Sequence, residues 1–159
     1  MKALTVRQPF AWAIAIGQKT VENRTRATKH RGLLAIHAGK TVYRADPDDR
    51  LILDAIAENE FAVGEAESSL GAVVAVAELR GCHHAHDCMP PVGVVPPSGL
   101  TGCSPWAMYG QYHWKLANVR SLPEPVPCKG SLGLWRLPED VERAVTEQLD
   151  VLMPIRSAG

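Results

Sequence analysis

The stretch LTVRQPFAWAIAIGQKTVENRT, residues 4–25, decides the fold of this chain. It begins inside an alternating segment, Lys2–Val6, which predicts a short β-strand. Pro9 suits the first turn of a helix over residues 10–16, and Gly17 suits the position after its end. The segment Lys19–Arg24 follows at once and predicts a second strand, with polar residues on both faces. The chain therefore opens as strand, short helix and strand.

The rest of the chain continues this mixed pattern of short elements. Apolar or alternating runs predict further strands, while a cap-plus-proline start and a terminal amphipathic segment predict helices. These elements are strands near residues 33–38, 72–79, 112–119 and 132–137, and helices near 46–59 and from Pro138 through Leu149. Five to six short strands, two to three helices and hairpin-like connections indicate an α+β fold around a small barrel.

Length and composition fit one globular domain. The chain has 159 residues, of which 46% are hydrophobic and 21% charged, and it contains no internal repeat. No N-terminal apolar segment is long enough for a signal peptide or a membrane span. The four cysteines are therefore expected as reduced thiols in a cytoplasmic protein that has no membrane partner.

The charges balance overall but are unevenly distributed. Seventeen basic and seventeen acidic residues give a formal net charge of zero, which argues against a protein that coats nucleic acid through bulk electrostatics. Residues 1–40 nevertheless carry a single acid, Glu22, against eight cations. A basic face opposite acidic helices is expected from this asymmetry. The eight cations are Lys2, Arg7, Lys19, Arg24, Arg26, Lys29, Arg31 and Lys40.

Three stretches follow one another along the chain: residues 4–25, quoted above, RGLLAIHAGK at 31–40, and SPWAMYGQYHWKLANVRSLPEPVPCKGSLGLWRLP at 104–138. In this order they resemble the ASCH family of the PUA-like superfamily. The family tends to carry a Trp just after the NRT turn, where this chain has Arg26–Ala27. The resemblance implies one domain over residues 1–159. The length of the segment around 82–102, its His- and Pro-rich composition and its lack of periodicity predict a mobile loop within this domain. The resemblance also implies a small PUA-like barrel of five to six mixed or antiparallel strands, flanked by two to three helices.

The polar residues of the signature turn are the leading candidates for chemistry. In an extended strand Thr20, Glu22 and Arg24 share one face, and a corner at Gly17–Lys19 would let Lys19 join them. A Lys and a Glu in one cleft can serve acid–base chemistry or hold phosphates and base edges. The alternative is a surface ion pair without a ligand.

The resemblance also suggests a specific reaction. Some ASCH members are amidohydrolases that remove the acetyl group of N4-acetylcytidine with a Lys, a nearby Thr and a carboxylate. The resemblance places Lys19 on that Lys, but Glu22 stands where the hydroxyl is expected, and Thr20 is the nearest hydroxyl. A variant chemistry in which Glu22 activates water and Lys19 stabilises the oxyanion is compatible with these residues.

Further ligand contacts are expected from aromatic, histidine and lysine residues downstream. Nucleobases stack on aromatic rings, and Trp106 in a loop suits this role, whereas Trp114, Trp12 and Trp135 are expected in the core. A lone histidine at a strand end is more often structural than catalytic. His37 can therefore be either a structural residue or a functional one. The candidate ligand-binding residues are Arg24, His37, Lys40, Ser104, Trp106, Tyr112, His113 and Lys129.

The segment Cys82–Cys88, CHHAHDC, has the most unusual local composition. Cysteine, histidine and aspartate are zinc ligands, and Cys103 is near in sequence. The segment lacks a paired C-x2-C spacing and is too compressed for all its members to bind one ion. We therefore expect a solvent-exposed loop with incidental metal affinity, and neither a metal site nor a cofactor.

Three functions follow from these observations. The first is a PUA-like module that binds RNA or a nucleotide or nucleoside, including a modified base. The second is a small hydrolase that acts on an acylated nucleoside such as N4-acetylcytidine, or that cleaves RNA. The third is an adaptor whose barrel is only a scaffold for protein partners. The sequence leaves the ligand, the protein partners and the oligomeric state open.

Overall fold

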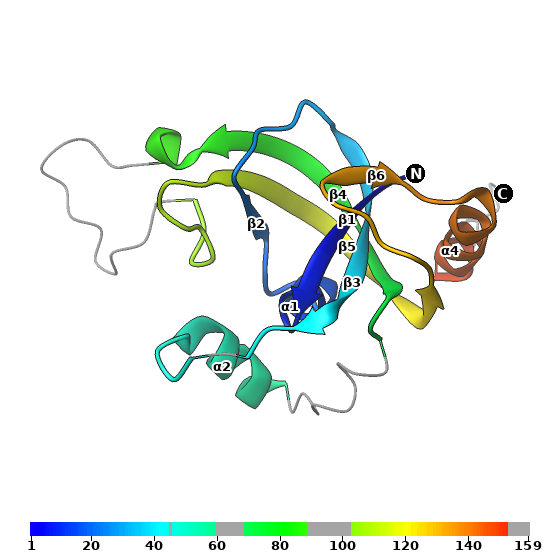
Figure 1. The fold of residues 1–159 in the computed structure, drawn as a ribbon, viewed down its shortest axis with the longest axis horizontal. Coiled ribbons are helices and arrows are strands. Elements are labelled where there is room, and N and C mark those ends of the chain that lie inside the picture. Colours follow the sequence, from blue (N-terminus) through cyan, green and yellow to red (C-terminus); the bar gives the residue numbers. More distant parts are fainter. Residues whose placement is uncertain (45, 60–68, 89–102, 153–159) are drawn as a thin grey trace, which may run out of the picture.

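The computed structural model describes residues 1–44, 46–59, 69–88 and 103–152. Its central element is a six-stranded sheet (Figure 1). The strand order is β2-β5-β4-β3-β1-β6. In chain order the strands are β1 (Lys2–Gln8), β2 (Val21–Arg24), β3 (Gly32–Val42), β4 (Ala72–His84), β5 (Tyr112–Pro127) and β6 (Leu134–Arg136).

The sheet is mixed and strongly curved. β1 pairs with β3 in parallel, and all other neighbouring strands pair in antiparallel fashion. Register shifts interrupt the β4–β5 ladder at three places, and such bulges bend a sheet. Within the described residues β2 and β6 form its two edges, so the sheet curls without closing. The α+β class and the number of strands and helices agree with the sequence prediction.

Helices cover both faces of the sheet. The described ones are α1 (Phe10–Ala15), α2 (Arg50–Glu58) and α4 (Glu139–Leu152), with a 3₁₀ turn at Ala85–Cys88. The inward residues of β1, Leu4 and Val6, join α1 in one core, while Ala3 packs with α4 in a second. This split follows from the alternation of side chains along a strand. None of the described helices has the length and apolarity needed to cross a membrane.

The turn from β1 into α1 and on to β2 is built by local contacts. The side-chain Oε1 of Gln8 accepts a hydrogen bond of 3.0 Å from the Trp12 amide, one of the donors that a helix start leaves unpaired. Gly17 ends the helix with a φ of +81°, a conformation that glycine adopts without steric cost. The backbone then returns toward the helix, and the amide of Lys19 donates to the Ala13 carbonyl at 2.9 Å.

Several strands are longer than the sequence indicates. β3 continues to Val42 and β5 to Pro127, past the apolar runs that predict them. β4 continues through Cys82–His84, so the prediction that a loop starts at Cys82 is wrong for these residues. Pairing with Tyr112–Trp114 of β5 holds this polar end of β4 in the sheet. The part of the predicted loop at 89–102 lies outside the described residues.

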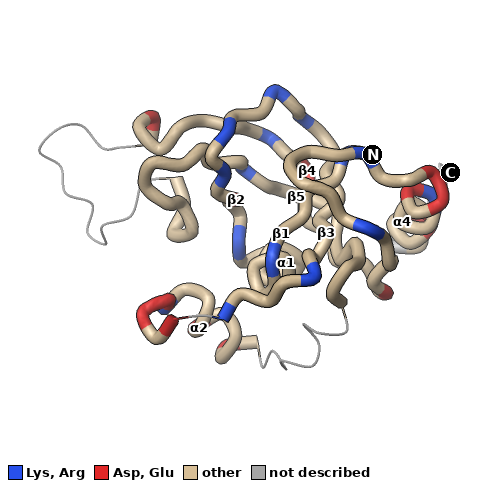
Figure 2. Tube along the Cα trace, in the orientation of Figure 1, with Lys and Arg blue, Asp and Glu red and all other residues tan. Residues whose placement is uncertain are grey.

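The charges separate as expected. Figure 2 shows Lys and Arg along β1, β2 and the connection that follows β2, whereas Asp and Glu gather at α4 and just before α2. This distribution places positive charge around the corner between β1, α1 and β2. All four cysteines are free thiols.

Candidate functional site

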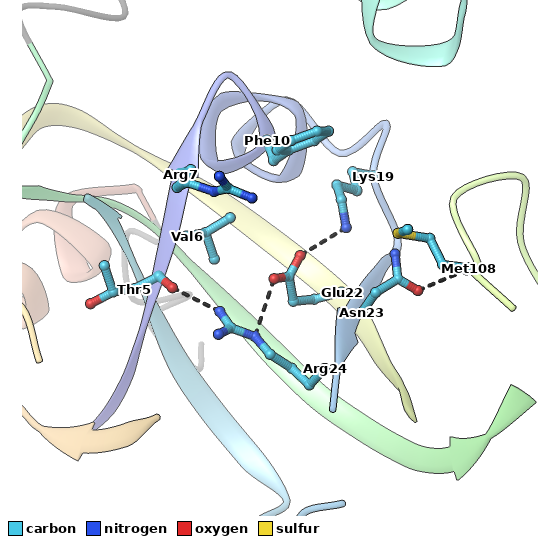
Figure 3. Close-up of a pocket in the computed structure, with 9 residues that line it drawn as sticks. All are labelled: Thr5, Val6, Arg7, Phe10, Lys19, Glu22, Asn23, Arg24 and Met108. Atoms are coloured by element: carbon cyan, nitrogen blue, oxygen red, sulfur yellow. Dashed lines mark hydrogen bonds and ion pairs between the residues drawn. The ribbon is translucent and has the colours of Figure 1, made fainter. Parts of the chain in front are cut away.

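A cleft lies at the corner between β1, α1 and β2 (Figure 3). Its inner part has a volume of about 270 Å³, and a wider part of about 560 Å³ continues toward α2. Small-molecule sites typically span about 300–1,000 Å³, so the two parts together suit a ligand of nucleoside size. The inner part is lined by Thr5, Val6, Arg7, Phe10, Lys19, Glu22, Asn23, Arg24 and Met108.

Lys19 is the central cation of the cleft. Its side chain is buried, and its ammonium donates to the backbone carbonyl of Val21 and, at 2.8 Å, to Glu22 Oε2. The corner after Gly17 thus brings Lys19 onto the Glu22 face, the arrangement that the sequence allowed. An ammonium has three N–H donors, and these two acceptors leave one of them for a ligand.

Glu22 joins Lys19 to Arg24. The Glu22 carboxylate is 10% exposed, and its Oε1 lies 3.2 Å from Arg24 Nε. Arg24 also donates from Nη2 to the Thr5 carbonyl of β1 at 2.7 Å, so it ties the edge strand β2 to β1 across the cleft. One carboxylate between two cations leaves the cluster with an excess positive charge. Such a charge favours an anionic or electron-rich ligand.

Two aromatic rings lie near the ammonium group of Lys19. Lys19 Nζ lies 6.0 Å from the ring centroid of Phe10 and 5.9 Å from that of Trp106. In the wider part, Arg7 lies over Tyr43 at 5.4 Å. These distances permit cation–π attraction, and the rings offer faces on which a planar base can stack.

Asn23 fixes the segment that carries Trp106. Its Nδ2 donates to the Trp106 carbonyl at 2.7 Å, and its Oδ1 accepts from the Met108 amide at 2.9 Å. The Asn23 side chain thus makes two hydrogen bonds to the backbone of one short loop, one to a carbonyl and one to an amide. The sequence analysis did not select Asn23, Arg7, Phe10 or Met108 as site residues. Only their place in the fold brings them together.

Several predicted site residues lie away from the cleft lining. Thr20 is exposed, and its hydroxyl lies 3.4 Å from Ser104 Oγ, which in turn accepts from the Trp106 amide at 3.2 Å. Tyr112 packs its ring edge-on against His84. His113 is fully buried and points at two cysteines rather than at the cleft. Ser104 therefore supports the loop that carries Trp106, and His113 is directed away from the cleft. A catalytic role of Thr20 and a ligand contact by Tyr112 stay predictions.

His37 belongs to a separate buried cluster. Its Nδ1 lies 3.3 Å from Thr5 Oγ1 and its Nε2 lies 3.1 Å from the Cys128 carbonyl. Burial lowers the pKa of His37, opposed by hydrogen bonds with the backbone of Cys128 and Gly71. These contacts favour the structural reading of this histidine. Lys40 and Lys129 are exposed and do not line the cleft.

Comparisons with known proteins agree with this architecture. The family model of the ASCH domain matches residues 4–125, which include the whole signature turn. The crystal structure of ASCH from Zymomonas mobilis superposes with a TM-score of 0.52 and 13% identity, covering 92% of this chain and 93% of that chain. A tyrosine-to-phenylalanine mutant of that protein gives a TM-score of 0.51, 13% identity and coverage of 92% and 96%. No curated protein matches the sequence. The structural likeness concerns the fold.

Proposed function

The chain belongs to the ASCH domain family, and from this premise we propose that its cleft binds unpaired RNA or a single nucleoside, including a modified base. ASCH domains are thought to bind RNA. The observation that carries the proposal is the buried Lys19 ammonium within about 6 Å of the rings of both Phe10 and Trp106. Proteins that read unpaired RNA stack bases on aromatic rings and bond their edges, and this cleft offers both contacts.

The charge distribution supports a small ligand footprint. Arg7 and Arg24 stand beside Lys19 at the cleft, while the chain as a whole is neutral. Contact with one or two phosphates next to a stacked base suits this distribution better than a long duplex does. The free cysteines are the form favoured by a reducing compartment, and we place the protein in the cytoplasm.

Binding is tested with fluorescein-labelled single-stranded RNA of varied sequence, read by fluorescence anisotropy. Lys19→Met keeps the length of the side chain and removes the charge, so we expect affinity to fall by about 10- to 100-fold, the range for a hydrogen bond to a charged group. Trp106→Ala removes a stacking partner, which is worth about 1–3 kcal/mol per base.

Arg143→Ala is the matched control, because Arg143 is an exposed cation on α4, outside the cleft lining. We expect its affinity to equal that of the unmodified chain. Near-UV circular dichroism checks that each variant is folded. Equal RNA binding by Lys19→Met, Trp106→Ala and Arg143→Ala would show that the cleft is not the binding site.

A second candidate, hydrolysis of an acylated nucleoside, is favoured by the 2.8 Å contact between Lys19 and Glu22. In such a reaction Glu22 would accept a proton from water as the water attacks the acyl carbon, and Lys19 would stabilise the oxyanion. The bond between the acyl carbon and the N4 nitrogen would then break, Glu22 would return the proton to the leaving amino group, and the acid and the free nucleoside would be released. Thr20 is exposed and bonds toward Ser104, so the geometry favours water over Thr20 as the nucleophile.

Incubation with N4-acetylcytidine, followed by chromatography, separates the two candidates. Turnover that is lost in Glu22→Gln and kept in Arg143→Ala would establish hydrolysis. Binding without turnover supports a recognition module.

A further inference from the structure

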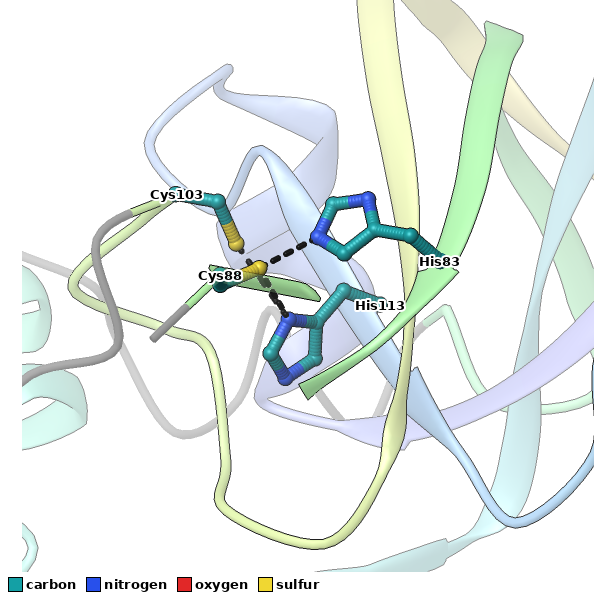
Figure 4. Close-up of side chains that lie close together, drawn as sticks. All are labelled: His83, Cys88, Cys103 and His113. Atoms are coloured by element: carbon teal, nitrogen blue, oxygen red, sulfur yellow. Dashed lines mark hydrogen bonds between the residues drawn. The ribbon is translucent and has the colours of Figure 1, made fainter. Parts of the chain in front are cut away.

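Four potential metal ligands converge outside the cleft (Figure 4). They lie beside residues 104–110, the loop that carries Trp106 and is called the Trp106 loop below. His83 lies near the end of β4, Cys88 ends the 3₁₀ turn, Cys103 precedes the Trp106 loop and His113 lies at the start of β5. One ligand atom from each residue lies within 4.8 Å of all the others. Figure 4 shows the two sulfurs and the two imidazole rings directed toward a common centre.

The separations are close to those of a metal site. Cys88 Sγ and Cys103 Sγ each lie 3.3 Å from His113 Nδ1, and His83 Nε2 lies 2.5 Å from Cys88 Sγ. In a tetrahedral zinc site with Zn–S near 2.3 Å and Zn–N near 2.0–2.1 Å, neighbouring ligand atoms are about 3.4–3.8 Å apart. Small side-chain adjustments would bring the four atoms to those distances.

A hydrogen bond orients His113 as a ligand. Its Nε2 lies 2.8 Å from the Met108 carbonyl, which can only accept, so Nε2 carries the proton. In the neutral ring the lone pair is then on Nδ1, the atom that faces both sulfurs. Metal-binding histidines commonly donate their other N–H to a carbonyl in this way, which fixes the tautomer and the ring orientation.

The fold assembles the four ligands from separate elements within residues 83–113. His83 and His113 are direct partners in the antiparallel pairing of β4 and β5. His113 is fully buried, and the other three side chains are partly buried. The neighbouring candidates have other contacts: Cys82 Sγ accepts from the Thr28 amide at 3.4 Å, and Asp87 accepts from the His84 amide at 3.3 Å. The unusual run of residues 82–88 thus supplies two ligands, and Cys103 and His113 supply the others.

We propose that His83, Cys88, Cys103 and His113 bind one structural zinc ion. Two thiolates and two imidazoles form a closed four-ligand set, the type found in structural rather than catalytic zinc sites. The proposal does not depend on RNA binding. It replaces the expectation of incidental metal affinity, because the ligand set now includes two residues outside the 82–88 segment.

Metal binding would also shape the cleft. The ion would join the ends of β4 and β5 to Cys103, which stands just before the Trp106 loop. The Met108 carbonyl accepts a hydrogen bond from His113 Nε2, and the Met108 amide donates one to Asn23 Oδ1. Met108 therefore links the metal ligands to the cleft wall. The inferred role is to hold the Trp106 loop in place.

Metal content is the first measurement. The full chain is produced in zinc-supplemented medium, purified with a phosphine reductant and no chelator, and analysed by inductively coupled plasma mass spectrometry. We expect about one zinc per chain, because a closed site of four strong ligands retains its ion. Cys88→Ser and Cys103→Ser should lose most of it, whereas Cys82→Ser and Cys128→Ser should keep it. A chain without zinc, or equal loss in Cys82→Ser, would overturn the proposal.

Cobalt substitution covers the case in which a variant does not fold. The unmodified chain, dialysed free of zinc and titrated with Co²⁺, should develop the visible bands of tetrahedral cobalt and a thiolate-to-cobalt charge-transfer band. Saturation at one equivalent, reversed by zinc, supports the assigned ligands. A spectrum of six-coordinate cobalt without a charge-transfer band would contradict them.

Discussion

Gly130 lies against the ring of His37, in the turn that precedes β6. A Cβ built at this position would stand 2.5 Å from His37 Cε1 and 2.9 Å from Thr5 Oγ1. Thr5 Oγ1 is itself held, since it donates to the Ser131 carbonyl at 3.0 Å and receives the Trp135 indole N–H at 3.2 Å. The neighbours of Gly130 thus have little freedom to move away.

Gly130→Ala is therefore expected to destabilise the fold. Forcing one extra carbon into a packed site costs about 1–3 kcal/mol. The free energy of unfolding, measured by urea denaturation, should fall by that amount. Gly81→Ala is the control, because the atom nearest to its added Cβ is the Lys115 side chain at 3.5 Å, an ordinary contact. Equal midpoints for the two variants would show that the turn around Gly130 adjusts freely.

At this scale the sequence predicts some site residues and not others. Lys19, Glu22 and Arg24 are near one another in the chain, so strand alternation and the corner at Gly17 are enough to group them. His113 and His83 become neighbours only through the pairing of β4 with β5. No local pattern encodes that register. The sequence analysis therefore expected His113 to contact the bound RNA or nucleoside and did not group it with His83.

Among the structural elements, the loop after Cys103 depends on β2 for its position. Asn23 binds the loop through both the Trp106 carbonyl and the Met108 amide. Asn23 belongs to a four-residue edge strand, and His113 Nε2 of β5 also bonds the Met108 carbonyl of the same loop. The loop and the strand are expected to loosen together.

Asn23→Ala should therefore raise hydrogen exchange in residues 103–110 by about 5- to 30-fold, since each of the two lost hydrogen bonds contributes a net of about 1 kcal/mol. Exchange in α1, measured in the same mass-spectrometry experiment, should not change. Asn59→Ala is the control, because Asn59 donates to the Ala55 carbonyl of its own helix and has no hydrogen bond to residues 103–110 within the described part of the chain. Unchanged exchange in residues 103–110 would show that other contacts hold the loop.

Element prediction succeeds where side chains alternate and stops where pairing alone extends a strand. The apolar run of β4 and the alternation at the start of β5 mark both strands clearly. The ends of these strands, including Cys82–His84, contain polar residues that a local reading assigns to loops. Their strand conformation comes from the facing strand, whose hydrogen bonds satisfy the backbone.

For the whole molecule, neutrality limits how strongly any polyanion is attracted. The cations at the cleft are offset by Asp48 and Asp49, which line its wider part, and by acids elsewhere on the chain. For single strands, log K changes with log salt by about −0.7 for each phosphate contacted, so two or three contacts give a slope of about −1.4 to −2. Anisotropy titrations between about 50 and 200 mM salt measure this slope. A slope twice as steep would place most contacts outside the cleft.

The position of β1 between β3 and β6 has a consequence for synthesis on the ribosome. β1 emerges first, yet its outer partner β6 follows about 130 residues later, as the Trp135 to Thr5 hydrogen bond shows. Throughout translation that side of β1 has no strand to pair with, and unpaired strand edges promote aggregation. The three residues of β6, translated after the other five strands of this sheet, thus protect the edge of the strand that precedes them all.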